Sequence, residues 1–248
     1  MQHLETIYRS SAIQDQETEA FLNASQCNLM ENLHSSHKDA GLKVLIALAD
    51  KQLEIMQDKQ HKVKVMIFLG QQIVRTKAYR DEVLRGLHRR NELEVEVADA
   101  VTHSWWFLSY MFGMNIGFSL FSSRHDSRHA LLVNDTDTPF ITSDHPVVNV
   151  HACVSETELS IPQHADFYYP ISPRITYIIC DSELFTPGKH SFNEAILNEF
   201  NTKVAAQAMV HLIGNTDAVI RPLKKNIGRR YLKNNISSLL TLLICNAP

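Results

Sequence analysis

Hydrophobic residues in the first half of the chain recur every three or four positions. This period places apolar side chains on one face of an α-helix. Residues 100–123 contain no Asp, Glu, Lys or Arg, so we expect a buried helix there, broken near Gly113. The pattern therefore predicts that residues 1–121 are mainly helical. Its three earlier helices are expected over residues 14–33, residues 41–56 and from about residue 58 toward residue 87.

After residue 122 the pattern changes to short runs of β-branched and aromatic residues, separated by turn residues. Such runs are typical of strands. A long helix is expected next, from about residue 192 to residue 212, and Val219 and Ile220 would form a closing strand. The strands are expected at residues 129–133, 140–142, 167–169 and 175–180.

These elements together predict an α+β fold. A helical N-terminal half would pack on a small, mainly antiparallel sheet, with a long C-terminal helix. The chain has no internal repeat and no low-complexity linker, so we expect a single domain over residues 1–248. Within it, residues 1–121 would be mainly helical and residues 122–222 would hold the strands and the long helix. Residues 223–248 would form a basic tail and a final apolar element.

The charge of the chain limits its partners. With 24 basic and 27 acidic residues and a formal net charge of −3, it has no overall attraction to nucleic acid or to an anionic membrane. One stretch differs from this near-neutral balance, because it holds six basic residues and no acidic residue between them. Such a stretch can bind the phosphate backbone of nucleic acid, and a solvated tail is the alternative. Its basic residues are Arg221, Lys224, Lys225, Arg229, Arg230 and Lys233.

Three further features favour a soluble protein of the cytoplasm. The N-terminus has no basic segment followed by an apolar stretch, so we expect no export signal. The four cysteines are far apart and form no Cys-x-x-Cys pair, which is typical of reduced thiols. The uncharged residues 100–123 are interrupted by His103, Asn115 and two glycines, so we expect no membrane association.

The first candidate for chemistry is Asp144, which follows a predicted strand. Thr142, Ser143 and His145 place two hydroxyls and an imidazole beside it. These oxygen and nitrogen atoms suit a divalent metal or a hydrolytic site, in which Asp144 would bind the metal or act as a base. The alternative is structural, because Ser-Asp-x-Pro is an Asx-type turn whose carboxylate binds nearby backbone amides. Both interpretations are open at this point.

Gln71 and Arg75 are four positions apart, so they would share a face of a helix. Arg75 follows apolar Ile73 and Val74, which predicts a partly buried guanidinium that needs a partner. That partner would be Asp144 or the phosphate or carboxylate of a substrate. Asn201 lies within the long predicted helix and would bridge toward the Asp144 loop or lie on the surface.

Other site patterns are absent or incomplete. His125 and His129 have the spacing of zinc ligands on a helix. However, Asp126 stands where a zinc protease needs Glu, and two neighbouring arginines would repel a cation, so we expect no zinc site. The chain has no phosphate-binding glycine loop, no dinucleotide fingerprint and no Gly-x-Ser-x-Gly elbow.

Several segments, taken in order over residues 60–213, resemble a bacterial family known as Domain of Unknown Function 4238. The resemblance implies a fold more directly than a function. Members of that family usually open with a Gln-His-Tyr-Val-Pro-like segment, whereas Gln2-His3 is followed here by Leu4-Glu5. The chain therefore resembles a version that lacks this segment or has a degraded form of it. If the segment carries part of a site, we expect the protein to be partly or wholly inactive. The matching segments are Gln71-Gln72-Ile73-Val74-Arg75-Thr76, Pro139-Phe140-Ile141-Thr142-Ser143-Asp144-His145-Pro146-Val147-Val148, Tyr169-Pro170-Ile171-Ser172-Pro173-Arg174, and Phe200-Asn201 followed by Ala208.

Two hypotheses for function follow. In the first, the chain is a metal-dependent hydrolase or nuclease that acts on a phosphate-bearing substrate. Asp144 would hold the metal or act as base, Arg75 would hold the phosphate, and His145 would assist in catalysis. The substrate would be bound by Gln71, Thr142, Ser143 and Asn201. In the second hypothesis, the chain is a non-catalytic binding or interaction module, a shortened relative of a larger protein.

Overall fold

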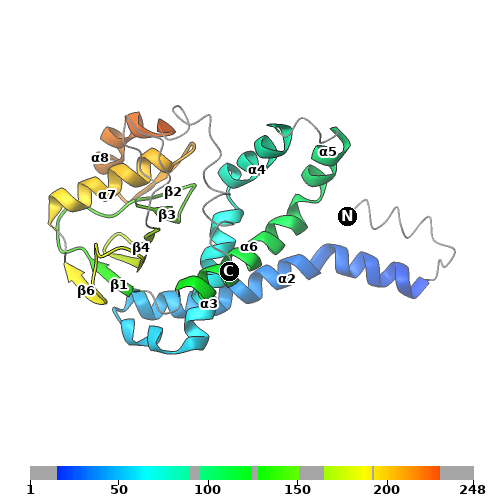
Figure 1. Cartoon of the computed structure of the whole chain (residues 1–248), viewed down its shortest axis with the longest axis horizontal. Helices are drawn as coiled ribbons and strands as arrows, with labels where there is room; N and C mark the ends of the chain where they lie inside the picture. The colour runs from blue at the N-terminus through cyan, green and yellow to red at the C-terminus, as the bar shows by residue number, and fades with distance from the viewer. Residues whose placement is uncertain (1–15, 90–94, 125–127, 151–164, 192, 230–248) are drawn as a thin grey trace.

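The computed structural model describes residues 16–89, 95–124, 128–150, 165–191 and 193–229 (Figure 1). α2 (Gln16–Ala49) is one helix of 34 residues, where the pattern predicted two, and the short 3-10 helix η1 (Leu53–Gln57) follows it. Gly41 lies inside α2. A Cβ atom at Gly41 would come within 2.5 Å of the Cβ of Phe68. The glycine therefore allows another helix to approach and does not end α2.

α3 (Lys59–Val74) and α4 (Lys77–Arg89) replace the single helix that we predicted from residue 58 toward residue 87. The chain turns at Arg75 and Thr76. The hydroxyl oxygen of Thr76 accepts a hydrogen bond from the backbone N–H of Tyr79 at 3.2 Å. This is how an N-cap residue starts a helix, and it explains why α4 begins there.

α5 (Val95–His103) and α6 (Trp105–Arg124) complete the helical half. The break between them lies at Ser104, so the predicted break near Gly113 is wrong. Gly113 stays helical because it and Gly117 face α3. A Cβ at Gly117 would come within 2.5 Å of the Cα of Ile67. The two glycines allow the helices to pack closely.

A five-stranded sheet has the order β3-β4-β5-β1-β6. Three of its four pairings are antiparallel, and β6 alone runs parallel to its neighbour β1. A separate two-stranded sheet pairs β2 (Thr142–Ser143) with β7 (Leu212–Ile213). The strands of the larger sheet are β1 (Arg128–Val133), β3 (Val148–Asn149), β4 (Phe167–Ser172), β5 (Ile175–Cys180) and β6 (Gly188–Ser191).

α7 (Glu194–Gln207) is shorter than the predicted helix at both ends. It begins after Asn193, whose side chain accepts a hydrogen bond from the backbone N–H of Ile196 at 2.9 Å. It ends because the backbone of residue 208 becomes extended. The predicted closing strand at Val219 and Ile220 is wrong: these residues lie in the short helix α8 (Asp217–Ile220), and the 3-10 helix η2 (Arg221–Asn226) follows.

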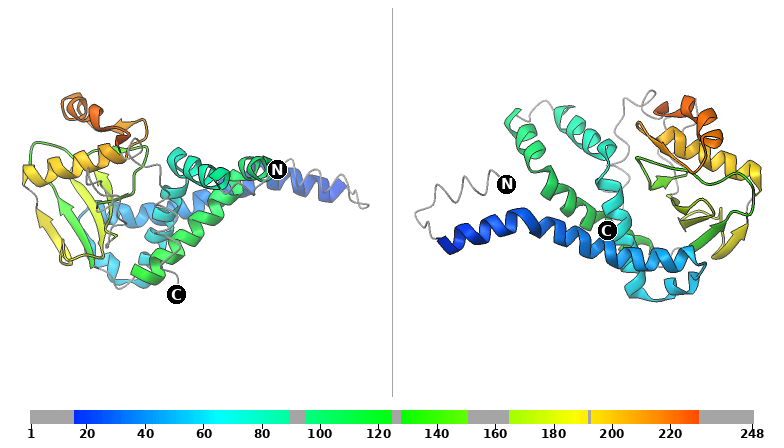
Figure 2. Two further views of the ribbon diagram at one scale, coloured as in Figure 1. Left: turned by 45° about the horizontal axis from the view of Figure 1, so that its top comes forward. Right: turned by 180° about the vertical axis from the view of Figure 1, so that it is seen from behind.

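The larger sheet lies between two groups of helices. One buried cluster joins α2, α3 and α6 to side chains such as Leu131 of β1 and Tyr177 of β5. A second cluster joins the other face, including Leu132 of β1, to Phe200 and its neighbours on α7. Figure 2 shows α7 against the sheet on the side away from α2 and α3. The α+β fold with a helical N-terminal half is therefore confirmed.

Candidate functional site

Asp144 binds backbone amides of the segment that follows α7. Its carboxylate accepts hydrogen bonds from the backbone N–H groups of Met209, Val210 and His211 at 2.9, 2.8 and 3.1 Å. The backbone N–H of Asp144 in turn donates to the carbonyl of His211 at 3.2 Å. These contacts favour the structural interpretation of Asp144. The amides come from a distant segment, however, and not from the turn around Asp144 itself.

The residues next to Asp144 serve the same turn. The hydroxyl of Ser143 donates to the carbonyl of His145 at 3.0 Å and accepts from the backbone N–H of His145 at 3.1 Å. Both side chains are buried. The hydroxyl of Thr142 is also buried and has no hydrogen-bond partner among the residues that the structure describes. The polar groups at this corner therefore mainly hold the backbone in place.

Asn201 makes the bridge that we considered from the sequence. Its side chain is 1% exposed, so the alternative of a surface residue is wrong. The amide oxygen accepts from the backbone N–H of Ile141 at 3.1 Å, and the amide nitrogen donates to the carbonyl of Pro139 at 2.9 Å. Asn201 thus fastens the strand before Asp144 to α7.

Gln71 and Arg75 do not share a site. Gln71 is buried where α3 meets α6, and its amide nitrogen donates to the carbonyl of Tyr110 at 3.1 Å. Arg75 is the C-cap residue of α3 and is exposed, so the prediction of a partly buried guanidinium is wrong. Its guanidinium makes no hydrogen bond or ion pair with Asp144, or with any other residue in the described ranges.

The other candidate charges are dispersed. Within the part of the chain that the structure describes, no group of three or more His, Cys, Asp or Glu side chains could hold a metal ion. His129 is buried with a ring nitrogen 2.6 Å from the hydroxyl of Tyr177, and His125 lies outside the described residues. Burial, followed by the nearby charge of Asp166, raises the pKa of Cys180 to about 12, so this buried thiol stays protonated.

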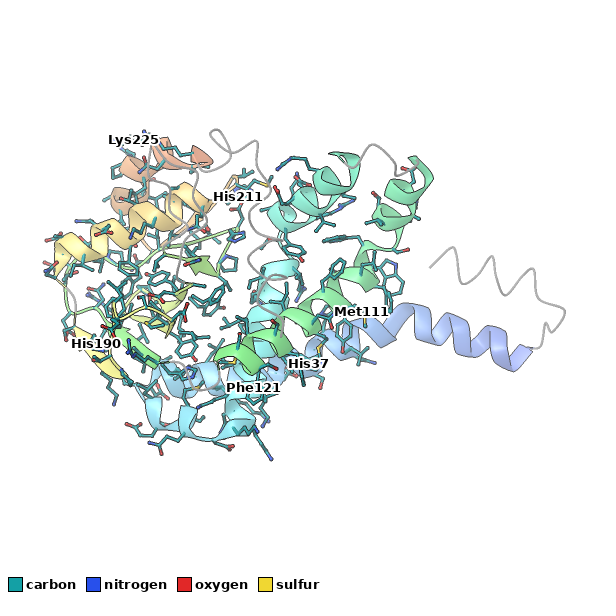
Figure 3. The ribbon with its side chains drawn as sticks, viewed as in Figure 1. His37, Met111, Phe121, His190, His211 and Lys225 are labelled. Carbon is teal, nitrogen blue, oxygen red and sulfur yellow. The ribbon has the colours of Figure 1, made fainter. Side chains whose placement is uncertain are left out.

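The basic stretch is only partly a cationic surface. Arg221 forms an ion pair with Asp217 at 2.6 Å, and Lys224 lies 4.0 Å from the same carboxylate. Lys225 is exposed. Figure 3 shows that it lies far from α2, on which His37 is labelled. Arg229 is also exposed, whereas Arg230 and Lys233 lie outside the described residues.

A pocket of about 850 Å³ lies along α2, between α3 and β4, and no pattern in the sequence indicated it. One end of this α2 pocket is polar and holds Arg75. A run of apolar side chains, some buried and some exposed, continues from it along α2. In the sequence these apolar positions have the spacing of the buried face of a helix, so nothing in their local pattern indicates a pocket. The polar lining residues are His34, Ser35, Lys38, Gln72 and Arg75.

The described residues that line the α2 pocket include cations but no acid. The charged groups of Lys38 and Arg75 also have no hydrogen bond or ion pair with a described residue. Burial lowers the pKa of His34, and the charges of Arg75 and then His37 lower it further. His34 is therefore largely neutral at pH 7, and the positive charge of the pocket comes from Arg75 and Lys38.

Comparison with known proteins adds one match. The sequence model of the family described as "Protein of unknown function (DUF4238)" matches residues 18–218, from α2 into α8. Nothing among the curated proteins or the solved structures matches the chain. In the described residues, no helix is both long and apolar enough to cross a membrane. Because the match spans well over half of the sequence, the chain belongs to the DUF4238 family of proteins of unknown function.

Proposed function

We propose that the protein is a non-catalytic binding module that holds the anionic group of a ligand in the α2 pocket. One observation carries this proposal: Arg75 and Lys38 line the same end of a pocket whose described lining residues include no acid, and neither cation has a partner among the residues that the structure describes. The charge of Arg75 also lowers the pKa of His34, so the guanidinium lies near this residue of α2. An anion between α2 and α3 would meet both cations.

The chemistry of the two side chains suits a carboxylate or a phosphate. A guanidinium offers paired N–H donors that match two oxygens of such a group, and an ammonium adds a second charge. Hydrogen bonds of this charged type contribute about 1.5–3 kcal/mol each. Since the site is open to solvent, we expect salt to weaken the binding.

The alternative of a metal-dependent hydrolase or nuclease stays a prediction. The side chains that it requires are engaged with the backbone: Asp144 with residues 209–211, and Asn201 with Pro139 and Ile141. Its test is thermal unfolding of the parent and of Asp144→Asn with Mg²⁺, Mn²⁺ or Zn²⁺. Stabilisation of the parent alone would favour the hydrolase. Bacterial origin, a cytoplasmic location and nucleic-acid binding by the basic stretch of residues 221–233 also stay predictions.

The test of anion binding is calorimetric titration with inorganic phosphate at pH 7.5, where His34 is neutral. We expect affinity in roughly the millimolar range. Arg75→Gln should weaken it about tenfold or more, because a charged hydrogen-bonding group is lost. Lys38→Gln should weaken it less, since an ammonium offers no bidentate contact.

Lys43→Gln is the matched control for Lys38→Gln. It removes the same charge from an exposed lysine of the same helix that does not line the α2 pocket. We expect it to change phosphate affinity less than twofold, roughly the effect of a change in overall charge at moderate salt. Equal affinities for the parent, Arg75→Gln and Lys38→Gln would overturn the proposal.

A further inference from the structure

The α2 pocket changes character along the helix. His34, Ser35 and Lys38 line one end, whereas Leu42, Ile46 and Ala49 line the continuation. At a rise of 1.5 Å per residue, Lys38 and Ala49 lie about 16 Å apart along the axis of α2. Such a length exceeds what a bare phosphate or a short carboxylate would occupy. The pocket therefore offers a cationic end and a long apolar end to the same molecule.

The apolar end has a buried floor and an exposed rim. Leu45 and Phe68 belong to the core, and the ring of Phe68 meets the ring of Tyr169 edge-on at 5.9 Å. In contrast, Leu42 and Ile46 are 43% and 54% exposed although both are apolar and line the same pocket. An apolar ligand segment lying on the floor would cover these two side chains and remove them from water.

We propose that the ligand is a free, single-chain amphiphile with an anionic head and an unbranched aliphatic tail. Its carboxylate or phosphate head would lie between Arg75 and Lys38, which rests on the anion-binding function proposed above. Its tail would follow α2 past Leu42 and Ile46 toward Ala49. The volume of about 850 Å³ is that of a site for one small molecule. Two cations and no acid among the described lining residues fit an anionic head and oppose a cationic one.

The first experiment measures the effect of tail length and head charge on the parent protein. Acetate, hexanoate, decanoate, decyl phosphate and decyltrimethylammonium are titrated calorimetrically at pH 7.5, below the concentrations at which they form micelles. We expect affinity to rise with tail length, by about three- to fourfold for each methylene that becomes buried. Decyltrimethylammonium should not bind, and the ratio of decanoate to decyl phosphate affinity identifies the preferred head. Equal affinity for acetate and decanoate would overturn the amphiphile.

The second experiment locates the tail. Ile46→Ser should weaken decanoate at least about fivefold, because a serine offers no comparable apolar contact, and should leave phosphate affinity unchanged. Ile213→Ser is the matched control, since Ile213 is 56% exposed on β7 and does not line the pocket. Decanoate affinity that is the same in Ile46→Ser and the parent would overturn the assignment of the tail.

The two proposals fail in different ways. If Arg75→Gln weakens phosphate but tail length has no effect, the anion site stands and the amphiphile falls. If decanoate binds equally well to the parent, Arg75→Gln and Lys38→Gln, its head does not lie between these cations and the amphiphile falls. The proposed function falls as well only if phosphate also binds all three proteins equally.

Discussion

Asp144 and Asn201 each use a side chain to bind the backbone of a distant segment. Asp144 accepts three amides from residues 209–211, and Asn201 binds the backbone on both sides of residue 140. Together they fasten β2, the segment before it and the chain after α7 to one another. A buried amide without its partner is costly, so both side chains contribute to the stability of this corner.

Replacing Asp144 by Asn tests this contribution. The substitution keeps the shape of the side chain but removes its charge and leaves one oxygen to accept hydrogen bonds. Since two of the three bonds lie near solvent, we expect the free energy of unfolding to fall by about 1–3 kcal/mol. The measurement is guanidinium denaturation. Asp137→Asn is the control, because Asp137 is exposed and has no side-chain bond to a described residue, and we expect a change within about 0.5 kcal/mol. Equal midpoints for Asp144→Asn and the parent would contradict the prediction.

The sequence could indicate that Asp144 lies at a strand end and binds amides, because Ser-Asp-x-Pro is a local pattern. It could not indicate which amides. The donors lie 65 to 67 positions further along the chain, and no periodicity connects such positions. Arg75 shows the opposite case. Its apolar neighbours suggested burial. However, α3 ends at Val74 because the chain turns at Thr76, and Arg75 is left exposed to solvent.

At the scale of elements, the contact between α3 and α6 depends on glycine. A Cβ atom at Gly70 would come within 2.4 Å of the carbonyl oxygen of Gly113 and 2.6 Å of the backbone nitrogen of Gly117. Both are backbone atoms, which cannot move without moving a helix. At Gly113 the nearest atoms belong to the side chain of Gln71, which can give way more easily. At Gly117 a Cβ would meet backbone atoms at 2.5, 3.0 and 3.1 Å, whereas at Gly70 all three nearest contacts lie within 2.9 Å, so Gly70 is the most sensitive of the three positions.

We expect Gly70→Ala to lower the free energy of unfolding by about 1–3 kcal/mol. Alanine is the better helix former by roughly 1 kcal/mol, but the forced separation of the backbones outweighs that gain. Gly86→Ala is the matched control, since Gly86 lies in α4 and a Cβ there would have no atom within 4 Å. It should raise stability by about 0.5–1 kcal/mol. Denaturation curves for both variants are the measurement, and shifts in the same direction would refute the close-packing argument.

Element types were predicted best where a long periodic run stands alone. The helices of the N-terminal half and the strands β1 and β5 follow such runs. The errors have physical causes. A separate helix was predicted to begin at Gly41 and a break near Gly113, yet each glycine lies inside a helix where another element approaches closely. Val219 and Ile220 favour a strand, but Asp217 opens a helical turn there and binds Arg221 four residues later.

At the scale of the molecule, the α2 pocket needs three elements that are far apart in sequence. Residues 34–49 of α2, residues 68–75 of α3 and two residues of β4 line it together. Each segment, taken alone, has the composition of an amphipathic helix or a strand. Only their arrangement leaves Leu42 and Ile46 exposed beside two cations that have no partner in the described part of the chain, so the site could not be predicted from a pattern along the chain.

The single domain that we predicted over the chain has a direct test in β1, whose side chains alternate between the two cores. Leu131 packs with α2, α3 and α6, and Leu132 packs with α7. Both are fully buried, so replacing either by Ala should lower the free energy of unfolding by about 2–5 kcal/mol. The only tryptophans, Trp105 and Trp106, lie in α6. They report on the helical half.

If the two halves unfold as one unit, Leu132→Ala must shift the tryptophan midpoint although its side chain faces away from α6. The measurement is guanidinium denaturation of both variants, followed by tryptophan fluorescence and by far-ultraviolet circular dichroism. We expect the two signals to shift together in each variant, because β1 belongs to both cores. A tryptophan midpoint that moves with Leu131→Ala but stays unchanged with Leu132→Ala would mean that α7 and its face of the sheet unfold independently, and the chain would then hold two cooperative units.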